Sequence, residues 1–228
     1  MSWFDSAVRI ARRDLLVEWR SRVALSQVLP FAAVVMVMFG FAIDDTSLMR
    51  RISPGLIVLA TMFSLLLLVQ RSFIVEREDG AFDALHIAGI RPSALFWGKS
   101  AALAVELAAL QAVLMVLAVV LYNAEIQASG VLLLVATWLV TTVALASVGT
   151  LYGGLAAGAR GRETLLPLLL LPVVAPVLIG ATRAVEAALG AKQAVTDGWP
   201  WTGLVALFAV VFGAGGTVAF GPLSEDDT

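Results

Sequence analysis

The residues that could carry chemistry begin with Gly98, Lys99 and Ser100, which have the order of the last three residues of a nucleotide-binding P-loop. In that loop, glycine backbone and the lysine hold phosphate groups. The motif needs a further glycine five residues before Gly98, where this chain has Ser93. We therefore interpret this stretch as the entry to a membrane span. The sequence predicts a protein that is not an enzyme and has no ATPase of its own.

Ligands for metals and haem are scarce in this sequence. It has no cysteine and one histidine, His86, so disulfides, thiolate metal sites, bis-histidine haem ligation and Ser-His hydrolysis all lack their parts. Four of the methionines are interpreted as pliable apolar packing within spans: Met36, Met38, Met62 and Met115. We expect no directly bound cofactor or metal, and no axial haem ligation by this chain.

Glu106 is an acid within a predicted span, one to two turns from its cytoplasmic end. Intramembrane acids are costly, so this residue is a candidate polar site and could serve ion-coupled transport. The alternative is that it reaches the membrane surface or hydrogen-bonds a neighbouring helix.

The composition places these residues in a membrane protein. The chain of 228 residues is 60% hydrophobic and 14% charged, against about 45–50% and about 25% in globular domains. Six apolar runs can each cross a hydrocarbon core about 30 Å thick. The predicted spans are residues 24–43, 52–70, 100–123, 131–159, 164–182 and 199–220. Residues 183–197 resemble a short polar helix. The fold class is all-α, a single polytopic domain over 1–228.

Residues 3–23 predict an amphipathic helix at the membrane interface. The apolar residues recur at spacings of three and four, and most arginines fall on another side. The apolar positions are Phe4, Val8, Ala11, Leu15 and Trp19. A plain basic tail is the alternative.

Residues 76–90 predict a short cytoplasmic helix between spans two and three. Asp79 can cap it, Gly80 allows the chain to turn, and Phe82 and Leu85 lie three apart on one face. An amphipathic helix with two apolar anchors suits a groove on another protein, so we interpret it as a coupling helix. A solvated connector is the alternative.

Spans four and five carry the helix-packing signals. Small residues at spacing four allow close helix approach, and prolines remove backbone donors and bend a helix beside a cavity or a crowded interface. The packing glycines are Gly149, Gly153, Gly154 and Gly158. The bending prolines are Pro167, Pro172 and Pro176.

The distribution of basic residues predicts the topology. With the N-terminus inside, eleven of the 15 lysines and arginines face the cytoplasm. Both termini are therefore predicted to be cytoplasmic, and so is the coupling segment.

Taken together, these motifs resemble the ABC-2 type transporter permeases, and within them the CcmB family of haem exporter proteins for cytochrome c maturation. The resemblance covers essentially the whole chain. It rests on Arg13-Asp14 with Glu18 and Arg20-Ser21-Arg22, on residues 78–85 leading to Lys99, and on Leu171-Pro172 with residues 176–179.

The resemblance implies a function and a set of partners. It implies a permease that couples ATP hydrolysis by a separate cytoplasmic ATPase to haem export or to release of the haem-loaded periplasmic chaperone. The implied assembly is a homodimer in the bacterial inner membrane, with a haem-handling membrane subunit that holds the haem, a small accessory subunit and no nucleic acid. The alternatives are an ABC-2 permease for another amphipathic or lipid-like substrate, or a non-conducting scaffold.

Overall fold

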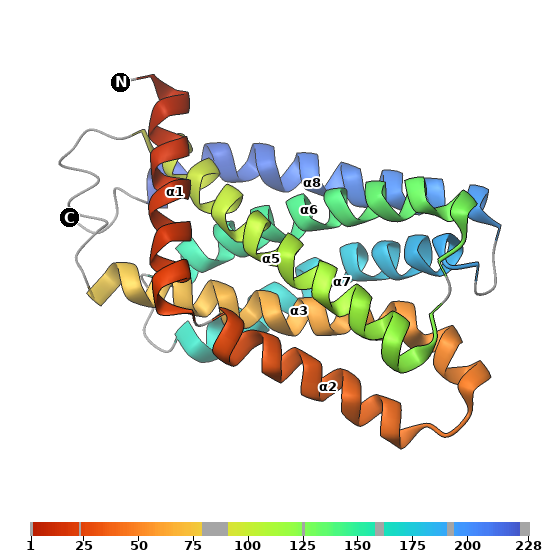
Figure 1. The fold of residues 1–228 in the computed structure, drawn as a ribbon. Coiled ribbons are helices and arrows are strands. Elements are labelled where there is room, and N and C mark those ends of the chain that lie inside the picture. Colours follow the sequence, from red (N-terminus) through yellow and green to blue (C-terminus); the bar gives the residue numbers. More distant parts are fainter. Residues whose placement is uncertain are drawn as a thin grey trace.

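The fold comes from a computed structural model that describes residues 2–22, 24–78, 91–124, 126–157, 162–190 and 194–223. These residues form helices and no strand. In chain order the elements are α1 (Trp3–Ser21), the π-helical turn η1 (Ala24–Val28), α2 (Leu29–Ala42), α3 (Thr46–Glu78), α5 (Pro92–Tyr122), the 3-10 turn η2 (Ala128–Gly130), α6 (Val131–Ala157), α7 (Arg162–Ala188) and α8 (Val195–Leu223) (Figure 1). The predicted all-α fold class is confirmed.

Five of the described helices are long and apolar enough to cross a membrane: α3, α5, α6 together with η2, α7 and α8. They match five of the six predicted spans. The predicted first span, 24–43, consists of η1 and the 14-residue α2. Residues 3–21 and 26–42 form a pair bent by 54°, which gives a sixth span if the pair crosses the membrane as one unit. The sixth span therefore stays a prediction.

The predicted separate helix over 183–197 is wrong. α7 continues without a break to Ala188, and α8 begins at Val195. The guanidinium of Arg183 lies 3.1 Å from the carboxylate of Glu186, one turn later in α7. The helix continues here because the apolar side chains of this stretch are buried against the bundle: Ala184, Val185, Ala187 and Ala188. The ion pair adds only about 0.2–0.5 kcal/mol.

The three predicted bending prolines lie inside α7: Pro167, Pro172 and Pro176. The helix is continuous through all of them, so its neighbours must satisfy the carbonyl groups that the prolines leave without donors. The bend itself stays a prediction.

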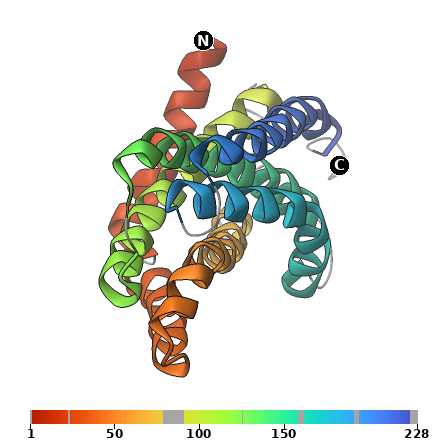
Figure 2. The same cartoon turned by 90° about the vertical axis from the view of Figure 1, so that its right-hand side faces the viewer.

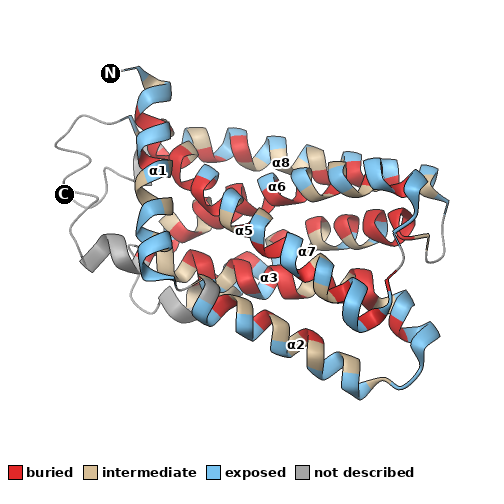
Figure 3. Cartoon of the chain, viewed as in Figure 1, coloured by how far each residue is buried: buried red, intermediate tan, exposed pale blue. Residues whose placement is uncertain are grey.

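The long helices form a bundle in which α6 contacts α3, α5, α7 and α8 (Figures 1 and 2). Buried residues gather where these helices face one another, and the outer surfaces stay exposed (Figure 3). Exposed apolar side chains along α2, α5 and α8 suit a lipid environment.

The described packing glycines of α6 lie against side chains of three other helices, α3, α5 and α8. A Cβ atom at Gly149 would come within 2.8 Å of the side chain of Val69 on α3, and Gly153 faces the same helix. Gly154 instead faces α8. These contacts are the close approaches that small residues permit. Gly158 lies outside the described residues.

α1 lies across the end of the bundle where α3 ends and α5 begins (Figure 1). It packs on α5 through Gly98, where an added Cβ would lie 2.7 Å from Cβ of Ile10 and 2.8 Å from the backbone oxygen of Ala7. The indole N–H of Trp3 donates to the hydroxyl of Ser93 at 3.0 Å. α1 and the first two turns of α5 are therefore in close contact.

Candidate functional site

Two described helices border the predicted coupling segment. α3 ends at Glu78, and α5 begins at Pro92. Four of the predicted coupling residues lie outside the described residues: Asp79, Gly80, Phe82 and Leu85. The candidate site described below lies beside these two helix ends.

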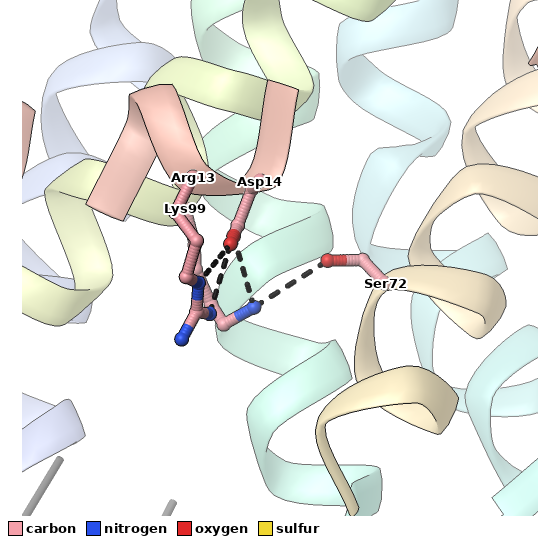
Figure 4. A network of polar contacts seen from close by, with 4 residues as sticks. All are labelled: Arg13, Asp14, Ser72 and Lys99. Carbon is pink, nitrogen blue, oxygen red and sulfur yellow. Dashed lines mark hydrogen bonds and ion pairs between the residues drawn. The ribbon is translucent and has the colours of Figure 1, made fainter. Parts of the chain in front are cut away.

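Lys99 is the centre of this site. Its side chain is only 2% exposed. Burial of an ammonium group costs roughly several kcal/mol unless the charge is paired. Its Nζ atom lies 3.3 Å from a carboxylate oxygen of Asp14 on α1 and 3.5 Å from the hydroxyl of Ser72 on α3 (Figure 4). The same atom lies 4.8 Å from the centre of the Phe73 ring. Contacts from α1 and α3 thus surround one cation of α5.

Asp14 is shared between two cations. One carboxylate oxygen pairs with Lys99, and the other lies 2.8 Å from the guanidinium of Arg13. The side chain of Asp14 is 14% exposed and that of Arg13 is 39% exposed. Asp14 therefore keeps a partner at the surface when its bond to Lys99 is lost, whereas Lys99 has no comparable access to water.

Glu18 forms a second link, one turn after Asp14 on the same side of α1. A carboxylate oxygen lies 3.6 Å from Nε of Arg71 on α3, and the other accepts the backbone N–H of Ala24 at the start of η1. The two acids, four residues apart, thus tie α1 to α5 and to α3. We call Asp14, Glu18, Arg71 and Lys99 the ion-pair cluster.

Comparison with known proteins identifies the family of this chain. The family model described as "CcmB protein" matches residues 5–221 of the chain. The chain belongs to the CcmB family. A relative in Haemophilus influenzae, named "Heme exporter protein B", is 29% identical over 189 residues, which cover 79% of this chain and 81% of that protein.

Other relatives carry the same name. The protein of Rhodobacter capsulatus is 31% identical over 182 residues, covering 76% of this chain and 79% of the relative. The protein of Paracoccus denitrificans is 28% identical over 215 residues, covering 93% of each chain. The resemblance to CcmB proteins drawn from the sequence is confirmed.

In this CcmB chain, Glu106 lies within α5, and its depth in the membrane stays a prediction. α5 begins at Pro92, so Glu106 is fourteen residues, about 21 Å of helix, from the first residue of α5. It is half-buried, seven residues after Lys99 and therefore on the same helix face. The charges of Asp14, Glu18, Lys99 and Arg71 all act on it, and no hydrogen bond joins it to another described residue. Glu106 lies about two turns beyond Lys99 along α5 and is not a member of the ion-pair cluster.

A cavity of about 290 Å³ lies between α3, α5, α6 and α7. Apolar side chains form most of its walls, and no charged residue is among those that line it in the described part of the chain. Two of its lining residues, Trp138 and Thr141, have a buried side-chain donor with no partner among described groups. Met115 also lines it. The cavity suits an apolar group and not an ion.

Sequence reasoning identified the importance of Asp14, Glu18 and Lys99 through resemblance, and it missed their contacts. Arg71 and Ser72 were not singled out. The sequence held two signals of these contacts. Two acids lie four residues apart in a helix whose other charged residues are mostly arginine, and a lysine precedes a long apolar run. In the described residues, no group of three histidine, cysteine or acidic side chains is arranged to hold a metal ion.

Proposed function

We propose that this CcmB protein is the membrane permease subunit of an ABC transporter complex for cytochrome c biogenesis. It couples ATP hydrolysis by a separate ATPase subunit to haem export, or to release of the haem-loaded periplasmic chaperone. The relatives named heme exporter protein B support the haem assignment. The observation that carries the coupling role is the buried pair of Asp14 and Lys99, because it joins α1 to a helix that borders the predicted coupling segment.

The ion-pair cluster supports this role through its position. A displacement applied at residues 79–90 acts on the end of α3 and on the start of α5. Lys99 and Arg71 carry that displacement to α1 through Asp14 and Glu18. A buried ion pair adds little net stability compared with apolar residues of the same shape, so its value here lies in fixing the register of three helices.

We infer that haem is held by a partner subunit and not ligated by this chain. Met36 and Met62 are buried among apolar side chains of the core, as packing residues are. Met115, in the wall of the cavity, is the described methionine best placed to meet an apolar ligand. In this proposal the chain transmits ATP-driven motion and gives haem at most an apolar contact.

Membership of the family supports a proposal for the assembly. It is a homodimer of this chain with a cytoplasmic ABC ATPase, a haem-handling membrane subunit and a small accessory subunit. It lies in the bacterial inner membrane with both termini in the cytoplasm. The coupling residues Phe82 and Leu85 then face the ATPase, and replacing either by Asp should prevent the ATPase from co-purifying while the spans stay folded.

The coupling role can be tested with Asp14→Asn and Lys99→Met in the complete complex in lipid nanodiscs. ATP hydrolysis and haem transfer to the periplasmic chaperone are measured separately. We expect hydrolysis to persist and haem transfer per ATP to fall on the order of tenfold, within the 1–3 kcal/mol or so typical of coupled sites. Unchanged transfer per ATP in both variants would reject the role of the pair.

A matched control is Glu186→Gln. Glu186 is also a buried acid in an ion pair, but it lies in the last turn of α7, at the end of the bundle away from α1 (Figure 1). This variant should keep haem transfer per ATP at the wild-type value. A partner ATPase that binds ATP without hydrolysing it separates coupling from a scaffold role, since a scaffold tolerates it.

Ion-coupled transport through Glu106 is the second candidate function. The half-buried position of Glu106 below the ion-pair cluster favours it. This transporter would work without the ATPase and would lose activity in Glu106→Gln. Haem transfer that requires ATP hydrolysis in both wild type and Glu106→Gln excludes it.

A further inference from the structure

α1 presents three different sides, which follow from the rotation of about 100° per residue in an α-helix. The first side packs on the bundle and includes Ala7, Ile10 and Asp14. The second side is apolar and exposed: Phe4 is 67%, Val8 48% and Trp19 76% accessible. The predicted apolar stripe of this helix is therefore turned away from the bundle core (Figure 3).

The third side is mainly basic, with the exposed apolar side chain of Leu16 among its arginines. Arg9, Arg12 and Arg20 are exposed, and no ion pair joins them to another described residue. On this side they are accompanied by one acid, Asp5, which accepts the hydroxyl of Ser2 at 2.6 Å. The basic side thus carries a net positive charge.

The other acids of α1 do not neutralise this charge, because they are paired inside. Asp14 pairs with Lys99, and Glu18 pairs with Arg71. The charged residues of α1 are therefore divided between its sides. Asp14 and Glu18 bind the bundle, and Arg9, Arg12 and Arg20 face outward, where another partner can bind them.

The arrangement of the two outward sides indicates the partner. The centre of the basic side lies roughly 100° around the helix from the centre of the apolar side. A helix with adjacent apolar and basic sides lies in the plane of a membrane interface, with the basic side at the headgroups. α1 also crosses the end of the bundle, where such an interface would lie (Figures 1 and 2).

We propose that the outer surface of α1 binds anionic phospholipids. Arg9, Arg12 and Arg20 take the phosphate groups, since a guanidinium can donate two parallel hydrogen bonds to a phosphate. Phe4, Val8 and Trp19 lie among the acyl chains. This binding is independent of the proposed transport function, because it involves neither the ATPase nor haem.

The test uses the full chain in bilayers of phosphatidylcholine. The chain has no cysteine, so Ala11→Cys places a single fluorescent label on the apolar side of α1. Brominated phosphatidylglycerol and brominated phosphatidylcholine are compared as quenchers. We expect the anionic lipid to quench preferentially, with the preference falling roughly fivefold for each arginine changed to glutamine, the factor that corresponds to about 1 kcal/mol per charge at an anionic surface.

Matched variants keep this test specific. Arg50→Gln with Arg51→Gln removes two arginines at the opposite end of α3 and should leave the preference unchanged. Arg→Lys at positions 9, 12 and 20 should keep most of it, because the charge remains. A label at Leu207→Cys, on an exposed position of α8, should show no preference.

Equal quenching by both lipids in the wild-type background would overturn the proposal. If a preference then appeared only after removal of residues 224–228, the acidic tail of the chain would be identified as the occupant in place of lipid. Preferential quenching that survives in the triple glutamine variant would also overturn it, since the arginines would not be the binding groups.

Discussion

Asp14→Asn should destabilise the protein more than Lys99→Met, although the two residues form one ion pair. Asp14→Asn removes a carboxylate that lies 3.3 Å from the ammonium group of Lys99, whose side chain stays buried at 2% exposed. Breaking a buried pair in this way costs about 3–5 kcal/mol. Lys99→Met removes the buried charge and leaves Asp14 bonded to Arg13 at the surface. Its cost should be about 1.5–3 kcal/mol, the range for one hydrogen bond to a charged group.

The double variant gives the interaction energy. Asp14→Asn combined with Lys99→Met removes both members of the buried pair, so its cost should fall below the sum of the single costs by about 1–3 kcal/mol. The free energy of unfolding is measured by titration of mixed micelles with a denaturing detergent, followed by tryptophan fluorescence. Two results would refute the reasoning: single costs that add, or Lys99→Met costing as much as Asp14→Asn.

Gly98→Ala should cost about 1–3 kcal/mol in the same unfolding titration, and Ile10→Ala should not restore the loss, because Cβ of residue 10 and the backbone oxygen of Ala7 both stay in place. At Asp45, hydrogen bonds from the Ser47 side chain and from backbone amides at the start of α3 lower the pKa of the carboxyl group below its ordinary value. The stabilisation by Asp45 should therefore be present above the ordinary pKa of an aspartate and disappear as the pH falls through the lowered pKa. The difference in unfolding free energy between wild type and Asp45→Ala should accordingly shrink in acid. The absorbance spectrum of the isolated chain titrated with haem should lack a sharp six-coordinate form. A six-coordinate spectrum lost in a methionine or tyrosine variant would restore direct haem carriage. The topology can be tested by labelling single cysteines with an impermeant reagent, with the exposed Arg91 preferred to the half-buried Ser93 for the cytoplasmic side. Positions expected to react from outside are Ser47, Ser129 and Gln193, and positions expected not to react are Arg91 and Ser224.

The long helices could be predicted because each apolar run had to be buried or placed in lipid. The end of α7 was missed for a local reason: Arg183 and Glu186 looked like the start of a polar segment, but the apolar residues around them are buried, so the spanning helix continues. The start of α5 at Pro92 was left open, since a proline at a helix start and an apolar run starting near Ser100 allowed two acceptable boundaries.

The ion-pair cluster could not be predicted, because it depends on how α1 is turned. The residue spacing in α1 indicated an apolar stripe, which suggested that this stripe would make the main contacts of the helix. In the structure a different side, with Ile10 and Asp14, faces α5, and three of the five stripe residues stay exposed: Phe4, Val8 and Trp19. Spacing along one helix identifies its sides, but it does not say which side a distant helix will use. The predicted coupling residues Asp79, Gly80, Phe82 and Leu85 remain predictions.

The contact at Gly98 also has a mechanical meaning. Close-packed protein atoms are nearly incompressible, and here the backbone of α5 meets α1 with no flexible side chain from Gly98 between them. A contact this close deforms little, so a displacement of the first turns of α5 should move α1 by almost the same distance. A larger residue would separate the helices and insert a softer layer. The glycine thus sets the stiffness of the contact.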